Sequence, residues 1–139
     1  MEKRRVLILC TGNSCRSQMA EGLVNRYLSE QWQAYSAGTS ASGSVHPLAV
    51  RSMAELDIDI SENISEPVEG YRELNPHLVI TVCDNASQNC PVWLGEGSVV
   101  HLPFDDPTKV IGSDAARMAA CREVRDRMRD ILLSYLREG

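Results

Sequence analysis

The strongest constraint on the fold is a short apolar run that passes directly into a polar loop and then into a helical stripe. Val6 to Leu9 is unbroken by any polar residue, which predicts a buried strand. After the loop Cys10 to Arg16, apolar residues recur at steps of three and one, the spacing of one helix face; they are Ala20, Leu23, Val24, Tyr27 and Leu28. Ser17 is the expected N-cap of this helix. This order predicts the first unit of an α/β fold.

The rest of the chain continues the alternation. Further strands are expected at 32–37, 78–82 and 99–102, and a short helix at 47–56. A long final helix is expected after its N-cap, Ser113, with one apolar face made of Met118, Cys121, Val124, Met128, Ile131 and Tyr135. Continuously apolar strands between helices predict a four-stranded parallel sheet with helices on both faces. No repeat or linker divides residues 1–139, so a single domain is expected.

Charge and cysteine usage narrow the class of protein. The net charge is −5, from 14 basic and 19 acidic residues, which argues against a nucleic-acid partner. No apolar stretch approaches the length of a membrane span or of a signal peptide, so no membrane association is expected. Five cysteines are an odd number in such a chain. We therefore expect a cytoplasmic protein whose thiols stay reduced and are used for catalysis or metal binding.

Three chemically active groups follow directly on predicted strands. Cys10 ends the first apolar run, Cys83 follows the strand at 78–82, and the pair Asp105-Asp106 follows the strand at 99–102. In a parallel α/β sheet the active site lies beyond the carboxyl ends of the strands. These groups are therefore expected to converge on one edge of the sheet.

The segment from Cys10 to Ser17 has the form of a cysteine, five residues, an arginine and a serine. Such a loop turns backbone N–H groups toward one point, and the following helix N-terminus adds positive potential. Arg16 adds a planar fork of donors suited to two oxygens of a tetrahedral oxyanion. The expected oxyanion-binding residues are therefore Thr11, Gly12, Asn13, Ser14, Cys15, Arg16 and Ser17. The same environment favours a Cys10 thiolate, and the Ser17 hydroxyl is placed to donate a hydrogen bond to it.

This segment resembles the phosphate-binding loop of low-molecular-weight protein tyrosine phosphatases and of the arsenate reductases that share their fold. Gln18-Met19-Ala20-Glu21 and Tyr35-Ser36-Ala37-Gly38 are similar to the reductase branch in particular. The resemblance implies that Asp106, which precedes Pro107, is the acid that protonates the leaving oxygen. The adjacent Asp105 remains an alternative.

A second pair of cysteines, Cys83 and Cys90, decides between the two branches. A phosphatase has no use for them, whereas a two-electron reduction needs thiols to supply the electrons. The resemblance to thioredoxin-coupled arsenate reductases implies arsenate as substrate, a Cys10–Cys83–Cys90 disulfide relay, thioredoxin as reductant and no cofactor. No metal is expected either, because gaps of four and six residues fit zinc spacing poorly and no histidine lies near either pair. A tyrosine phosphatase and a non-catalytic oxyanion or redox sensor are the alternatives.

Several other residues are given only secondary roles. Cys15 is treated as an auxiliary thiol of the loop, and Cys121 as a buried structural cysteine. The histidines, His46, His77 and His101, are expected to be structural. Asn13, Glu21 and Ser36 resemble a cation-binding set of the family, but Glu66 stands where an aspartate is expected. That cation site therefore stays open.

Overall fold

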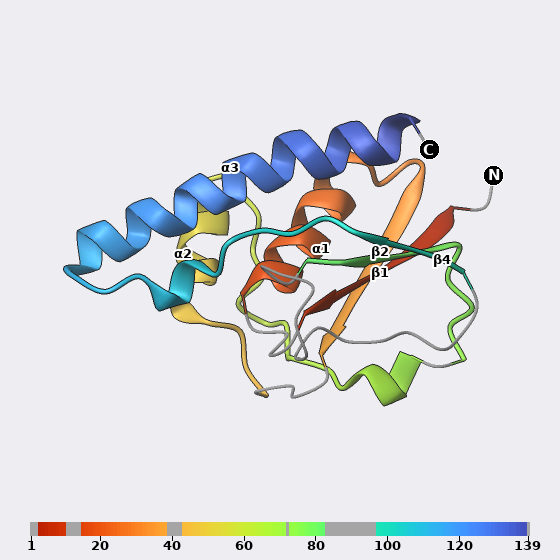
Figure 1. Cartoon of the computed structure of the whole chain (residues 1–139), viewed down its shortest axis with the longest axis horizontal. Coiled ribbons are helices and arrows are strands. Elements are labelled where there is room, and N and C mark those ends of the chain that lie inside the picture. The colour runs from red at the N-terminus through yellow and green to blue at the C-terminus, as the bar shows by residue number, and fades with distance from the viewer. Residues whose placement is uncertain (1–2, 11–14, 39–42, 72, 83–96, 139) are drawn as a thin grey trace.

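The computed structural model describes residues 3–10, 15–38, 43–71, 73–82 and 97–138. Helices and strands alternate along the chain as the sequence predicts (Figure 1). In chain order the elements are β1 (Arg4–Cys10), α1 (Arg16–Tyr27), β2 (Trp32–Gly38), α2 (Pro47–Ala54), the 3₁₀ helix η1 (Val68–Tyr71), β3 (Leu78–Thr81), β4 (Ser98–His101), the 3₁₀ helix η2 (Pro107–Lys109) and α3 (Asp114–Glu138).

The four strands form one sheet in the order β2-β1-β3-β4, and every neighbouring pair is parallel. This confirms the predicted α/β class and the four-stranded parallel sheet. In the register of the sheet, Leu9 lies beside Ala37 on one side and Thr81 on the other. β1 and β3 are therefore the two central strands. β4 is an edge strand, and for that reason its Val99 is 52% exposed although it is apolar.

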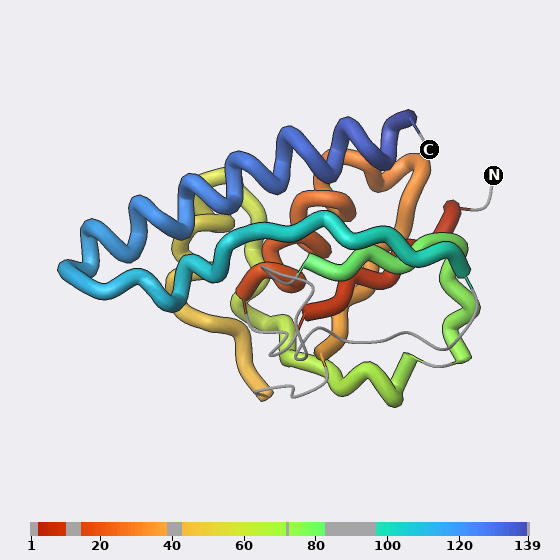
Figure 2. The backbone as a smooth tube through the Cα atoms, in the orientation of Figure 1, coloured from red at the N-terminus to blue at the C-terminus, as the bar shows by residue number. Residues whose placement is uncertain are grey.

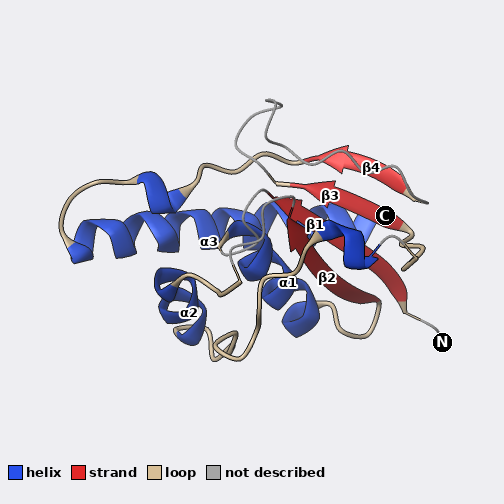
Figure 3. Cartoon of the chain, turned by 90° about the horizontal axis from the view of Figure 1, so that it is seen from below, coloured by secondary structure: helices blue, strands red, loops and turns tan. Residues whose placement is uncertain are grey.

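Alternate residues of β1 feed two different cores. Val6 and Ile8 belong to the larger core, to which α1, α2 and α3 contribute. Leu7 and Leu9 belong to a smaller core on the opposite face, which includes Val68 of η1. Figures 1 and 3 show α3 running along the molecule with α1 and α2 beside it. Both faces of the sheet are thus covered by helical segments, and the apolar residues of the central strands β1 and β3 are buried between them.

The final helix differs from its predicted form on one face. Ser113 is its cap as expected, since the Ser113 Oγ accepts a hydrogen bond from the Ala116 N–H at 3.1 Å. The assignment of Ile131 and Tyr135 to the apolar face is wrong: these side chains are 41% and 38% exposed. Leu132 and Leu136 are buried in their place. One residue corresponds to about 100° around a helix, so the buried stripe drifts by one position along so long an element. Within the described residues no helix combines the length and apolar character needed to span a bilayer.

Candidate active site

Cys10 is the last residue of β1 and stands at the carboxyl edge of the sheet with 3% of its surface exposed. Its Sγ lies 3.0 Å from the Oγ of Ser17, in a fully buried contact. Either the hydroxyl or the thiol can be the donor in this contact. The structure therefore brings Cys10 and Ser17 together as the sequence predicts.

The prediction that Ser17 caps α1 is wrong. The N-cap is Cys15, and Ser17 lies inside the first turn of the helix. The Ser17 hydroxyl lies against the Cys10 sulfur instead. Of the predicted oxyanion-binding residues, Cys15, Arg16 and Ser17 are described, whereas Thr11, Gly12, Asn13 and Ser14 lie outside the described residues. Because α1 begins at Arg16, the positive end of its dipole lies at the Cys10 edge.

Arg16 joins the start of α1 to the loop that follows β4. Its Nη1 donates to the carbonyl oxygen of Phe104 at 3.0 Å, and its Nη2 lies 3.6 Å from the Oδ2 of Asp106. Both side chains are largely shielded from water. A guanidinium and a carboxylate buried in this way need each other, since removal of one partner leaves an uncompensated charge. Arg16 and Asp106, which are far apart in the sequence, are thus brought together at the edge that carries Cys10.

Asp106 is held in one orientation by its own turn. Its Oδ1 accepts hydrogen bonds from the backbone N–H of Thr108 at 3.0 Å and from the Thr108 hydroxyl at 2.6 Å. This arrangement caps η2 and leaves Oδ2 directed at Arg16. The neighbouring Asp105 is exposed. The geometry therefore separates the two aspartates that the sequence left as alternatives, and it is Asp106 that faces Arg16.

Cys83 and Cys90 lie outside the described residues, but the chain can be followed to the residue before Cys83. The Val82 N–H donates to the Leu9 carbonyl at 2.9 Å, so Val82 is hydrogen bonded to the residue that precedes Cys10. The connection after β1 leads to β2 on one side, whereas β3 and β4 lie on the other side. Such a reversal of strand order is where ligands bind in open α/β sheets. Figure 2 shows the segment after β4 passing this same edge on its way to α3.

A polar cluster beneath the site contains two members of the suspected cation-binding set. The Glu21 carboxylate accepts hydrogen bonds from the Ser36 Oγ and the Asn63 Nδ2, both at 3.3 Å. Burial, with a smaller contribution from the charge of Glu66, raises the pKa of Glu21 to about 7. A cavity of about 250 Å³ is lined in part by Glu21, Ser36 and Glu66. Asn13 lies outside the described residues, so the set as a whole remains a prediction.

Some contacts of the site have no signal in the local sequence. Phe104 contributes only its carbonyl oxygen, which accepts from Arg16, and Thr108 acts by orienting Asp106.

His46 lies at the start of α2. Its Nδ1 accepts a hydrogen bond from the Leu48 N–H at 3.1 Å and caps this helix. Burial and then the charge of Arg117 lower the pKa of His46, while the charge of Asp106 opposes this shift. His46 thus has a structural contact, as expected, but it also lies within electrostatic reach of the site.

Comparison with known proteins agrees with this geometry. Residues 5–104 match the family described as low molecular weight phosphotyrosine protein phosphatase. An arsenate reductase of Halalkalibacterium halodurans is 42% identical over 139 residues, which is 100% of this chain and 99% of the relative. An arsenate reductase of Bacillus subtilis is 40% identical with the same coverage.

Solved structures are similar over nearly the same length. A structure described as an arsenate reductase in the phosphate binding state superimposes with a TM-score of 0.79 at 29% identity, covering 97% of this chain and 98% of that one. An arsenate reductase in oxidized state gives a TM-score of 0.74 at 29% identity, covering 91% and 92%. With the buried cysteine, arginine and aspartate converging at the switch point of the sheet, these matches show that the chain belongs to the low molecular weight phosphotyrosine protein phosphatase family, in the branch that includes the bacterial arsenate reductases.

Proposed function

We propose that this protein reduces arsenate to arsenite, with Cys10 as nucleophile and Cys83 and Cys90 as the thiols that supply electrons. One observation carries the proposal. The Cys10–Ser17 contact and the Arg16–Asp106 pair stand beside the end of β3, from which the chain leads directly to Cys83. The relatives that match the whole chain are named arsenate reductases, which supports the same reaction.

The first step is displacement at arsenic. Arsenate is held by the loop after Cys10, by the N-terminus of α1 and by the Arg16 guanidinium. The Cys10 thiolate, supported by the Ser17 hydroxyl, forms a sulfur–arsenic bond. One arsenate oxygen leaves as water after Asp106 donates a proton to it. Thr108 keeps Asp106 turned toward this position, so the acid does not have to reorganise during the step.

The second part of the reaction transfers electrons. The Cys83 thiolate attacks the Cys10 sulfur, the sulfur–arsenic bond breaks, and its electron pair stays on arsenic, which leaves as arsenite. Cys90 then attacks Cys83, which releases the Cys10 thiolate and leaves a Cys83–Cys90 disulfide. Thioredoxin, the reductant implied by the family resemblance, restores the two thiols. This cycle suits the reducing bacterial cytoplasm, where thiols persist.

A tyrosine phosphatase is the second candidate, because the same loop also binds phosphate in the family. That enzyme needs Cys10, Arg16 and Asp106 but has no use for Cys83 or Cys90. A non-catalytic oxyanion or redox sensor would bind the anion or form disulfides without multiple turnover. The three classes therefore differ in what the second cysteine pair does.

The test is arsenate-dependent NADPH consumption with thioredoxin and thioredoxin reductase, run beside hydrolysis of an aryl phosphate. Cys10→Ser should abolish both activities. Cys83→Ser should abolish arsenate reduction and leave any slow aryl phosphate hydrolysis intact. Cys90→Ser should allow one equivalent of arsenite to form and then stop. Cys121→Ser is the matched control, since its thiol takes no part in this cycle.

The reductase assignment fails if Cys83→Ser consumes NADPH at the wild-type rate. The phosphatase assignment replaces it if the wild type hydrolyses the aryl phosphate rapidly and gives no arsenate-dependent signal. Multiple turnover of Cys90→Ser with thioredoxin would instead show that the order of the relay is wrong.

A further inference from the structure

The ring of His46 takes part in the first turn of α2. Pro47 has no backbone N–H. The N–H groups of Ala49 and Val50 donate to the His46 carbonyl oxygen at 3.0 and 3.2 Å. The Leu48 N–H donates instead to the Nδ1 of the His46 ring at 3.1 Å. The ring therefore accepts the hydrogen bond that the side chain of an N-cap residue normally accepts.

This contact fixes which nitrogen of the ring carries the proton. A neutral imidazole has one N–H donor and one acceptor, so an Nδ1 that accepts leaves the proton on Nε2. A protonated ring has donors at both nitrogens, and its Nδ1–H would face the Leu48 N–H. Leu48 is buried, so its N–H would lose an acceptor where water reaches it poorly. The cap therefore requires the neutral ring.

Charges around the ring also act on its protonation. The N-terminus of α2 carries the positive end of the helix dipole, which repels a further positive charge. Burial and the charge of Arg117 on α3 lower the pKa of His46, whereas the charge of Asp106, the cap of η2, opposes this shift. Arg51 of α2 is paired with Asp114 of α3 through two hydrogen bonds of 3.1 Å. A proton on His46 is thus favoured by Asp106 and opposed by burial, the helix dipole and Arg117.

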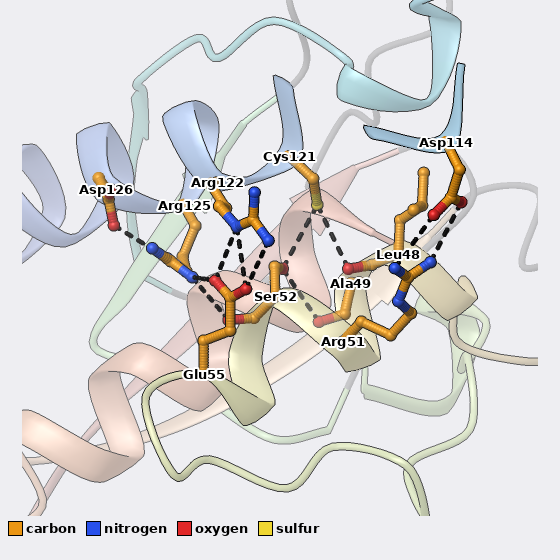
Figure 4. Close-up of polar contacts among 10 residues, drawn as sticks. All are labelled: Leu48, Ala49, Arg51, Ser52, Glu55, Asp114, Cys121, Arg122, Arg125 and Asp126. Carbon is orange, nitrogen blue, oxygen red and sulfur yellow. Dashed lines mark hydrogen bonds and ion pairs between the residues drawn. The ribbon is translucent and has the colours of Figure 1, made fainter. Parts of the chain in front are cut away.

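The other end of α2 is held to α3 by ion pairs (Figure 4). The Glu55 carboxylate follows directly on α2 and pairs with Arg122 at 2.8 Å and with Arg125 at 2.7 Å. Hydrogen bonds from these two arginines lower the pKa of Glu55 to about 2. Arg125 also donates to the Ser52 carbonyl oxygen at 2.7 Å. The carboxyl-terminal half of α2 therefore stays fastened to α3 when the ring at the start of the helix changes its charge.

We propose that His46 is a proton-sensitive cap, which holds the first turn of α2 while its ring is neutral and releases that turn when the ring is protonated. This device does not depend on the arsenate chemistry proposed above. It lies close to the site in the chain, because Gly38 at the end of β2 is beside Cys10 in the sheet and precedes His46 by eight residues (46 − 38). Protonation therefore loosens the entry to α2 on the β2 side of the site, and it places a positive charge within electrostatic reach of Asp106.

The pH range of this release follows from the direction of the pKa shift. The pKa of His46 is lowered from 6.5 in the folded chain, so the unfolded chain takes up this proton first as the pH falls. Stability from the cap is therefore complete above about pH 6.5 and is lost as the pH falls through the pKa of the folded protein. Release is expected on the acid side of neutrality.

The first test observes the ring and the helix by NMR in the full-length protein labelled with ¹⁵N. Long-range ¹H–¹⁵N correlation at pH 8 should show the His46 proton on Nε2, with the signals of His46 identified by their loss in His46→Asn. As the pH falls from 8 to 5, the Leu48 amide signal should shift together with the His46 ring, and its protection from hydrogen exchange should decrease. The Met53 amide lies in the fastened half of α2 and is the internal control, which should show neither change.

The second test is urea unfolding of the wild type, His46→Asn and His46→Ala from pH 8.5 to 4.5. Asparagine offers a capping oxygen that takes up no proton, whereas alanine cannot cap. At pH 8.5 the wild type and His46→Asn should be similar, and the unfolding equilibrium constant of His46→Ala should be roughly fivefold larger. At pH 4.5 the wild type should approach His46→Ala, while His46→Asn keeps its advantage. Other titrating groups, Glu21 among them, are the same in all three proteins and cancel in the comparison.

The proposal is overturned if the His46 proton lies on Nδ1 at pH 8, or if the Leu48 amide does not follow the titration of the ring. A difference between the wild type and His46→Asn that stays constant from pH 8.5 to 4.5 would also overturn it. Equal responses of the Leu48 and Met53 amides would show that the whole helix responds, which contradicts a local cap. If His46→Asn does not fold, His46→Ser takes its place, because serine also has a capping oxygen. These readouts do not involve arsenate, so they stand or fall separately from the reductase function.

Discussion

Replacement of Glu21 by glutamine tests whether a buried carboxylate under the site is neutral near physiological pH. Glu21 accepts hydrogen bonds from Ser36 and Asn63 and lies in the electrostatic field of Glu66. Glutamine has the same shape and carries no charge. The Glu21→Gln variant therefore resembles the protonated wild type at every pH. The contact with Asn63 is the exception, because the Asn63 Nδ2 then faces either the oxygen or the NH₂ group of the glutamine amide.

The magnitude follows from the pKa of Glu21, which rises from 4.5 in the unfolded chain to about 7 in the folded protein. One pKa unit corresponds to about 1.4 kcal/mol, so a shift of this size is worth about 3 kcal/mol. The raised pKa means that the folded state binds a proton more tightly than the unfolded state does. Stability from this proton is complete below about pH 4.5 and is lost as the pH rises through about 7.

The assay is urea unfolding of the wild type and of Glu21→Gln from pH 4.5 to 8.5, in buffers whose only cation is tetramethylammonium. This cation is bulky, so no small cation can compensate the Glu21 charge. The free energy of unfolding of Glu21→Gln relative to wild type should rise by about 3 kcal/mol across this range, with most of the rise between the two pKa values. Glu69→Gln, at an exposed carboxylate of η1, is the control and should show no such trend.

A difference between Glu21→Gln and wild type that stays constant from pH 4.5 to 8.5 would refute the reasoning. It would mean that Glu21 has the same protonation in the folded and unfolded chains, and that burial does not control its charge. A pH-independent loss of stability that is added to the predicted rise would not contradict the reasoning, since it would measure only the altered contact with Asn63.

Three further substitutions test contacts of the site and its support. In Arg16→Lys, arsenate should protect Cys10 from an alkylating reagent about tenfold to hundredfold less well than in the wild type, because a point charge replaces a bidentate fork. Equal protection in the two proteins would contradict oxyanion binding by Arg16. Asp106→Asn should slow single-turnover arsenite formation by roughly 10²–10⁴-fold, which is the usual contribution of a general acid. Asp105→Asn should leave this rate unchanged. Equal effects of the two substitutions would contradict the assignment of the acid to Asp106 alone. Arg125→Met should lower the free energy of unfolding by about 3 kcal/mol, since it removes hydrogen bonds from a buried contact. The exposed ion pair of Arg51 with Asp114 serves as the comparison. A similar loss of stability in Arg51→Met would contradict the role of burial.

The sheet could be predicted from the sequence because its signals are local and strong. Val6 to Leu9 and Leu78 to Val82 are too apolar to lie anywhere except between two covered faces. The convergence of Cys10 with Asp106 followed from the rule that loops meet at the carboxyl edge of parallel strands. Neither inference needed knowledge of a contact between residues distant in the chain.

The errors arose where a tertiary contact outweighed a local preference. Ser17 has the residue type of an N-cap, but the buried Cys10 sulfur engages its hydroxyl, so the cap falls to Cys15. The stripe of α3 drifted past Ile131 because helical periodicity is not a whole number of residues. The placement of Cys121 on the buried face of α3 was not among these errors, since its side chain is fully buried.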